Sequence, residues 1–128
     1  MKHLAIFDDL SVKKILDGRK TLDLRLSLNR IPPYRRVTVG DKVLIKKSGG
    51  QVVGQFKAES VVTYDHLTPA QLDKLHRDFK KEIAMEDYFW AEHAHARFAT
   101  LIYISQVQPS LIPLTFKKKD RRAWVVLK

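Results

Sequence analysis

The clearest pattern in the chain is the strict alternation of residues 21–28, TLDLRLSL. A leucine stands at every second position, and the positions between them hold Thr21, Asp23, Arg25 and Ser27. Successive side chains of a β-strand point to opposite faces. The pattern therefore predicts a strand whose polar row faces solvent or a cleft, and whose other face is core: Leu22, Leu24, Leu26 and Leu28.

The residues before this strand predict a shorter strand followed by a helix. Residues 3–7 are mostly apolar, and apolar residues then recur at helical spacing over residues 12–16. Residues 8–11 offer two aspartates and a serine as helix caps. Gly18 should end the helix, because a glycine just past the last turn takes the left-handed conformation at little cost. Lys20 then lies at the junction of helix and strand.

The remainder of the chain predicts five more strands and two more helices. A Pro-Pro loop precedes a hairpin, and a Thr-Pro pair begins a helix in the preferred way. The expected strands are residues 42–47, 51–64, 98–107, 111–116 and 123–127, and the expected helices are residues 68–84 and 87–96.

Strands dominate the two ends of the chain, and strands and helices do not alternate along it. A doubly wound parallel sheet is therefore not expected. A helix-turn-helix is not expected either, because the adjacent helix pair lacks a basic second helix. The pattern predicts one α+β domain over residues 1–128, a mixed and strongly bent sheet or small β-barrel with helices on its side.

Charge separates two segments from the rest of the 128-residue chain. Residues 30–47 and residues 115–128 each hold six basic residues and one acidic residue, so together they account for the net charge of +10. Such clustering is typical of a protein that binds a polyanion, and the alternative is a domain with a basic surface. The candidate contacts are Tyr34, Arg35, Arg36, Lys46, Lys47, Lys117, Lys118, Lys119, Arg121 and Arg122.

Other features of the composition narrow the class of protein. The chain has no cysteine, which excludes a disulfide framework and thiolate metal sites and favours a reducing compartment. Its first apolar run is four residues long, too short for a signal peptide or a membrane span. We therefore expect a cytoplasmic protein that does not associate with a membrane.

The helix-to-strand junction carries the most specific candidate chemistry. Arg25 can hold a phosphate or a base edge with two parallel hydrogen bonds. Lys20 adds a positive charge, and Asp23 can orient either cation or accept a hydrogen bond from an exocyclic amine. The alternative is an ordinary surface ion pair between Asp23 and Arg25, which contributes little to stability.

Three further features have both a functional and a structural interpretation. Thr21 beside Lys20 could be a nucleophile with its base, or a β-branched residue that starts a strand. His93 and His95 could bind a metal, but residues two apart on a helix point to different faces, and no third ligand is evident. Trp90 could stack on a base or pack against the sheet.

The run Gly18-x-Lys20-x-x-Asp23-x-Arg25 resembles the G-x-K-x-x-E-x-R signature of the ASCH domains, members of the PUA-like superfamily. The resemblance covers nearly the whole chain, because VGDKVLI, ATLIYISQV and RRAWVVL follow in the order that the family shows. One departure is visible: Asp23 replaces the usual glutamate and is one methylene shorter.

This resemblance implies a small β-barrel with flanking helices and a cleft between helix and barrel, lined by the signature. Many ASCH proteins are thought to bind RNA or modified bases, and some are reported as ribonucleases. One branch removes acyl groups from acetylated cytidine. Its catalytic lysine corresponds to Lys20, but its threonine nucleophile corresponds to Asp23, so the transfer of that activity fails at the nucleophile.

The sequence thus favours a module that binds RNA, single-stranded or carrying a modified base, and grips a nucleotide in a basic cleft. The alternative is an enzyme acting on RNA or nucleosides, a metal-assisted ribonuclease or an amidohydrolase. Lys20 and Asp23 would then be its acid–base pair, and a further carboxylate could come from Glu82, Glu86 or Glu92. A third hypothesis is an interaction domain for an acidic protein. No cofactor is expected except a divalent metal in the nuclease case. DNA as a partner, the oligomeric state and metal binding by the histidines stay open.

Overall fold

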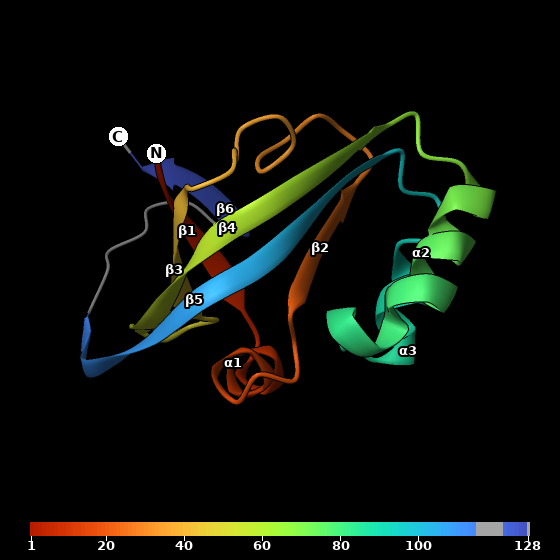
Figure 1. The fold of residues 1–128 in the computed structure, drawn as a ribbon. Coiled ribbons are helices and arrows are strands. Elements are labelled where there is room, and N and C mark those ends of the chain that lie inside the picture. The colour runs from red at the N-terminus through yellow and green to blue at the C-terminus, as the bar shows by residue number, and fades with distance from the viewer. Residues whose placement is uncertain (115–121, 128) are drawn as a thin grey trace.

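The computed structural model describes residues 1–114 and 122–127, and within them the chain forms six strands and three helices (Figure 1). The elements follow in the order β1 (Lys2–Phe7), α1 (Asp9–Leu16), β2 (Leu22–Ser27), β3 (Lys42–Lys47), β4 (Val52–Asp65), α2 (Pro69–Ile83), α3 (Asp87–Glu92), β5 (Phe98–Leu114) and β6 (Trp124–Leu127).

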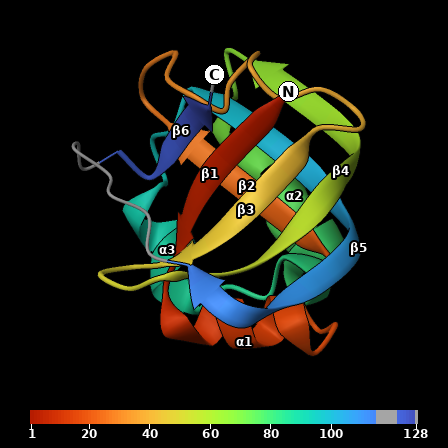
Figure 2. The same cartoon turned by 90° about the vertical axis from the view of Figure 1, so that its left-hand side faces the viewer.

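The strands form one curled sheet in the order β2-β5-β4-β3-β1-β6, with β1 and β3 parallel and the other neighbours antiparallel. Figure 2 shows the curl, which makes a half-barrel closed below by α1. The predicted class is confirmed: a mixed α+β fold with a strongly curled sheet and flanking helices. Strands β2 and β6 are the edges of the sheet, and we call the gap between them the seam.

Two apolar cores hold this arrangement together. One lies inside the curl, where Val12 and Ile15 of α1 pack on Ile45, Phe56 and other residues of the sheet. The second lies between the β2–β5 side of the sheet and α2 with α3. Burial of apolar side chains is the main stabilising term in folding. Because β2 contributes to the second core from one face only, its other face is left for the seam.

Strand β2 follows the predicted alternation over part of its length. Leu22 and Leu24 are buried, and Leu26 is partly buried against the second core. Leu28 is 62% exposed, so its predicted place in the core is wrong. The physical reason is that β2 ends at Ser27, and the alternation of side chains ends with the strand.

Most element boundaries lie within one residue of the prediction, and two elements, β5 and α3, differ by more. Residues 98–114 form one long strand where two were expected, because β5 continues past Pro109 and pairs there with Gly54 of β4. This approach is close: a Cβ on Gly54 would lie 2.9 Å from the carbonyl oxygen of Gln108. Helix α3 ends at Glu92 instead of Ala96, because His93 takes the C-cap position.

Candidate functional site

Lys20 is brought to the seam by the way α1 begins and ends. Asp8 caps the helix by accepting a hydrogen bond of 2.7 Å from the backbone N–H of Ser11. Gly18 follows the last turn with φ +84°, a left-handed conformation that glycine adopts freely. The backbone N–H of Lys20 then donates to the carbonyl of Lys14 at 2.9 Å. The chain is thereby folded back, and the Lys20 side chain points into the protein.

The Lys20 ammonium group is buried and bound to backbone. Lys20 is 1% exposed, and its Nζ donates to the carbonyl oxygen of Ile83, the last residue of α2, at 2.6 Å. A cation at a helix C-terminus is favourable, since the last carbonyls of the helix carry partial negative charge. Burial lowers the pKa of Lys20 to about 8, and the nearby charge of Asp23 offsets only part of this effect.

Asp23 and Arg25 form the ion pair that the strand alternation predicts. The Asp23 carboxylate is buried and accepts a hydrogen bond of 2.9 Å from Nε of Arg25. Arg25 also donates from Nη2 to the carbonyl oxygen of Ile6 on β1 at 3.2 Å. Its guanidinium lies 4.7 Å from the ring centre of Phe7 and 5.1 Å from that of Trp124. Arg25 therefore bridges the seam, from edge strand β2 to β1 and edge strand β6.

A small cavity lies on each side of this bridge. The first, of about 130 Å³, is called the Lys20 cavity and is lined by Ile6, Phe7, Asp8, Ser11, Lys20, Asp23, Leu24, Arg25, Met85 and Phe89. The second, of about 80 Å³, is called the Tyr34 cavity and is lined by Arg25, Leu26, Ser27, Ile31, Pro32, Pro33, Tyr34, Thr100, Ala123 and Trp124. Arg25 is the residue that the two cavities share.

The charges in the Lys20 cavity are balanced. Lys20 and Arg25 face Asp8 and Asp23, so the walls of this cavity carry two side chains of each sign. Among the described residues, the remaining lining of this cavity is apolar except for Ser11, which supplies a hydroxyl group. This hydroxyl donates to Sδ of Met85 at 3.6 Å. The cavity itself is therefore not the basic cleft that the sequence predicts.

Basic residues of the first charged segment are divided between different places. Arg35 and Arg36 are exposed, and Nη2 of Arg35 lies 3.5 Å from the Asp65 carboxylate. Lys46 is buried and donates from Nζ to the Lys47 carbonyl at 3.2 Å, so it is a poor candidate for a phosphate contact. The register of β3 shifts between Ile45 and Lys46, which turns two successive side chains to the buried side.

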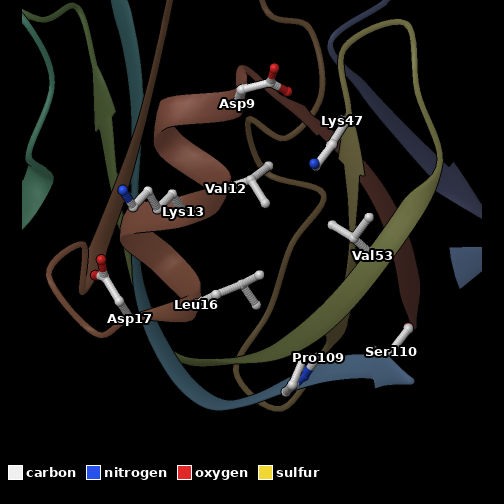
Figure 3. A pocket seen from close by; sticks show the side chains of 9 residues that line it. All are labelled: Asp9, Val12, Lys13, Leu16, Asp17, Lys47, Val53, Pro109 and Ser110. Atoms are coloured by element: carbon white, nitrogen blue, oxygen red, sulfur yellow. The ribbon is translucent and has the colours of Figure 1, made fainter. Parts of the chain in front are cut away.

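Lys47 reaches a different hollow on the opposite face of α1. Figure 3 shows this hollow, of about 510 Å³, with Val12 and Leu16 of α1 facing Val53 of β4. Its polar rim holds Asp9, Lys13, Asp17 and Lys47. Lys20, Asp23 and Arg25 do not line this hollow, so Lys47 does not join their cluster at the seam.

The second charged segment can be placed only in part. Arg122 is exposed and lies just before β6. Lys117, Lys118, Lys119 and Arg121 lie outside the described residues, so their predicted role stays a prediction.

Trp90 does not present a free face for stacking. It is 7% exposed, and its ring stacks on His76 at 4.3 Å and meets Phe89 edge to face at 5.4 Å. Its predicted role as a base platform is therefore wrong, because the tryptophan fills the core between α2 and α3. Tyr34, one of the candidate contacts for a polyanion, is also buried.

Nδ1 of His93 donates a hydrogen bond of 2.7 Å to the carbonyl oxygen of Phe89 at the end of α3. His95 is exposed. Within residues 1–114 and 122–127, no group of three His, Asp or Glu side chains could hold a metal ion. No helix in the same residues is long and apolar enough to span a membrane.

Several residues of the site were not singled out from the sequence. Phe7 and Trp124 support Arg25, Ser11 and Phe89 line the Lys20 cavity, and Ile6 supplies a carbonyl group. Their local patterns indicate only core, caps and strands. They reach the site because the curl of the sheet brings β1, β2 and β6 together, and a pattern of residues within each strand does not predict that approach.

Comparisons with known proteins bear on the fold. No protein-family model matches the chain, and no curated protein sequence matches it. A crystal structure of an ASCH protein from Zymomonas mobilis has a TM-score of 0.76 at 17% identity, over 99% of this chain and 87% of that chain. Two single-substitution mutants of that protein give TM-scores of 0.75 and 0.76. A hypothetical protein, PH0355, has a TM-score of 0.54 at 14% identity, over 86% of this chain and 100% of that chain. The predicted resemblance is confirmed at the level of the fold: this chain has an ASCH-like fold.

Proposed function

We propose that the protein is an RNA-binding module that holds one nucleotide of a single strand at the seam, with the base in the Lys20 cavity. The observation that carries the proposal is the preformed cluster of Lys20, Asp23 and Arg25 at a cavity between the two edges of the sheet. The net charge of +10 supports it, since basic proteins attract the phosphate backbone. The ASCH-like fold supports it as well.

Each member of the cluster has a defined part in this proposal. Arg25 is held in one orientation by Asp23, by the Ile6 carbonyl and by two aromatic rings, so it loses little conformational freedom when a ligand binds. These contacts use two of the five N–H groups of a guanidinium, and the others serve a base edge. Asp23 accepts from an exocyclic amine of the base. Lys20 neutralises Asp23 and closes the cavity floor against α2.

The test is binding of a short single-stranded oligoribonucleotide by the wild type and by Arg25→Lys, which keeps the charge and removes the planar fork. We expect Arg25→Lys to weaken binding by roughly 10- to 100-fold, the scale of a lost bidentate contact of about 1–3 kcal/mol. Arg77→Lys is the control, because Arg77 is exposed on α2. Equal affinities for the wild type and the two variants would refute the site.

One observation favours a second candidate function, hydrolysis of an acylated nucleoside. The pKa of Lys20 is about 8, so a fraction of this lysine is neutral near pH 8 and could act as a base. Ser11 supplies a hydroxyl to the same cavity, whereas Asp23 occupies the position of the threonine nucleophile in the related branch. Turnover of N4-acetylcytidine by the wild type, abolished in Ser11→Ala and in Asp23→Ala, would favour this function over binding alone.

A further inference from the structure

A buried hydroxyl group without a partner lies in the second cavity of the seam. Tyr34 is 6% exposed, and its Oη is buried with no hydrogen-bond partner in the described part of the chain. A buried hydroxyl that makes no hydrogen bond destabilises the folded state, and such groups are rare in folded proteins. Because Tyr34 lines the Tyr34 cavity beside Arg25, this hydroxyl suggests a group that is supplied by a ligand.

Packing, and not the hydroxyl, fixes the position of the tyrosine ring. The ring meets Phe98 edge to face at 5.0 Å, and the guanidinium of Arg35 lies 5.3 Å from its centre. The backbone N–H of Tyr34 donates to the carbonyl of Ile31 at 3.0 Å. The side chain is therefore held in place before any ligand binds, and its hydroxyl has no structural task among these contacts.

The chemistry of the cavity walls indicates what the ligand group is. Among the described lining residues, hydroxyl side chains come from Ser27, Tyr34 and Thr100, the one charged residue is Arg25, and the others are apolar. A phosphate would require free cationic groups, whereas Arg25 is already paired with the Asp23 carboxylate. The volume of about 80 Å³ admits several water-sized groups and is smaller than the Lys20 cavity. A neutral, compact group with hydroxyls on an apolar frame fits these walls, which is a description of a sugar.

We propose that the Tyr34 cavity receives the ribose of the bound nucleotide, and that the Tyr34 hydroxyl forms a hydrogen bond with the ribose 2′-hydroxyl. This inference rests on the proposed binding of a base in the Lys20 cavity. Arg25 lines the two cavities, so adjoining parts of one nucleotide can occupy them at the same time. A phenolic hydroxyl and a 2′-hydroxyl can each donate and accept. The 2′-hydroxyl is the group by which a protein distinguishes RNA from DNA at a given site.

The experiment compares a fluorescein-labelled single strand made of A and C with its deoxyribo counterpart of the same sequence. The two probes differ only in their 2′-hydroxyl groups. We expect the wild type to bind the ribo strand about tenfold more tightly, the scale of one hydrogen bond to a buried group. Tyr34→Phe should lower the ribo affinity to near the deoxyribo affinity and leave the deoxyribo affinity unchanged. Tyr64→Phe is the matched control, because Tyr64 loses the same atom on β4 and lines neither cavity.

Thermal unfolding keeps the result interpretable. Tyr34→Phe should keep or raise the melting temperature, because the removed hydroxyl has no partner within residues 1–114 and 122–127. A lowered melting temperature would overturn the inference by assigning the hydroxyl a structural role. Equal binding of the two strands by the wild type, or equal losses for the two strands in Tyr34→Phe, would also overturn it and leave nucleotide binding standing. Failure of the wild type to bind either strand would instead refute the proposed function, and the ribose site with it.

Discussion

Arg25 shows how one side chain can serve the fold and the candidate site together. The strand pattern alone places Arg25 on a polar face. From that pattern one would expect that removing the side chain opens no cavity and leaves no partner unpaired, and the structure shows otherwise. In the structure its side chain is only 17% exposed, and it stacks on Phe7 and Trp124 and donates to Asp23 and Ile6. The alternation within β2 correctly predicts the Asp23–Arg25 pair. The contacts across the seam could not be predicted, because they depend on how far the sheet curls.

The first prediction concerns the stability cost of removing this side chain. Arg25→Ala should lower the free energy of unfolding by roughly 2–4 kcal/mol, because it removes the cation that is hydrogen-bonded to the buried Asp23 carboxylate. Arg77→Ala, an exposed position on α2, should change it by less than about 0.5 kcal/mol. Urea denaturation measures the two values. If the two variants were equally stable, the bridge across the seam would contribute nothing to the fold.

The second prediction concerns the contribution of Lys20 to the pH dependence of the free energy of unfolding. The pKa of Lys20 is lowered from 10.5 to about 8 by burial. Between these values the unfolded chain binds more protons at this residue than the folded chain, so folding becomes more favourable as pH rises. The full change is roughly 3 kcal/mol, at about 1.4 kcal/mol per pKa unit. Below pH 8 the lysine is charged in the folded and the unfolded chain, and the advantage is lost.

Lys20→Met isolates this contribution, since it has no proton to lose. The free energy of unfolding of the wild type relative to Lys20→Met should rise as pH increases from 7 to 10, because every other titrating group is common to the two proteins. Urea denaturation at several pH values gives the difference. A difference that stays constant over this range would mean that Lys20 is not buried as the structure places it.

At the scale of the elements, a chain of three buried side chains ties β6, β1 and the turn before β3. Indole Nε1 of Trp124 donates to Nδ1 of His3 at 3.0 Å, and His3 Nε2 lies 2.8 Å from the Asp41 carboxylate. An indole nitrogen can only donate, so Nδ1 of His3 accepts and its Nε2–H donates to Asp41. The order of hydrogen bonds therefore fixes a neutral histidine tautomer. Trp124 is held in this way beneath Arg25, so edge strand β6, which borders the seam, also positions the site.

The third prediction tests this link through Asp41. Burial raises the pKa of Asp41, but hydrogen bonds from His3 and from the N–H of Thr38 lower it more, to about 2. An acid with a lowered pKa stabilises the fold above its ordinary value of 3.8 and ceases to do so as pH falls toward 2. Asp41→Asn should therefore cost about 2 kcal/mol at pH 7, and the cost should shrink between pH 4 and pH 2.

Thermal or urea unfolding of Asp41→Asn across this pH range provides the measurement. Asp73→Asn, at an exposed position on α2, is the control and should unfold like the wild type at each pH. A cost that is the same at pH 2 and pH 7 would contradict the assignment of the lowered pKa to Asp41.

The elements were predicted unequally well, and the differences have physical causes. Helix α2 begins after the predicted cap Thr68, and α1 begins after Asp8, one of the three cap candidates, because capping is a local interaction. The end of β5 was placed too early, because Pro109 indicates a strand end when the neighbouring chain is unknown. In the fold, Gly54 leaves room for the backbone of β5, and the strand continues. The predicted and the observed end of β5 therefore differ because of a contact between residues more than fifty positions apart in the sequence.

At the scale of the whole molecule, fold and charge are separate properties of the sequence. The order of apolar segments predicts the curled sheet, since each strand must bury one face. The net charge of +10 does not predict where the basic residues gather, and the structure divides them. Arg35 lies beside Asp65, Lys46 is buried, and Lys47 borders the hollow on the far face of α1. The Lys20 cavity carries balanced charge, so attraction to RNA must come from the surface around it.

The last prediction therefore concerns the salt dependence of RNA binding. Each phosphate contact releases condensed cations, so the logarithm of the affinity should fall linearly with the logarithm of the salt concentration, by about 0.7 per contact for a single strand. The two basic segments should give a slope of several units. Arg36 is exposed and lies two residues after Tyr34, and Arg36→Ala should reduce the slope by about 0.7. Replacing Lys117, Lys118 and Lys119 together by alanine should reduce the slope by about 2. Arg25→Lys keeps its charge, so it should lower the affinity at every salt concentration and leave the slope unchanged. The measurement is the affinity of a labelled single-stranded oligoribonucleotide at several salt concentrations for each protein. A slope near zero in the wild type would exclude contacts to the phosphate backbone, because such contacts cannot form without releasing cations.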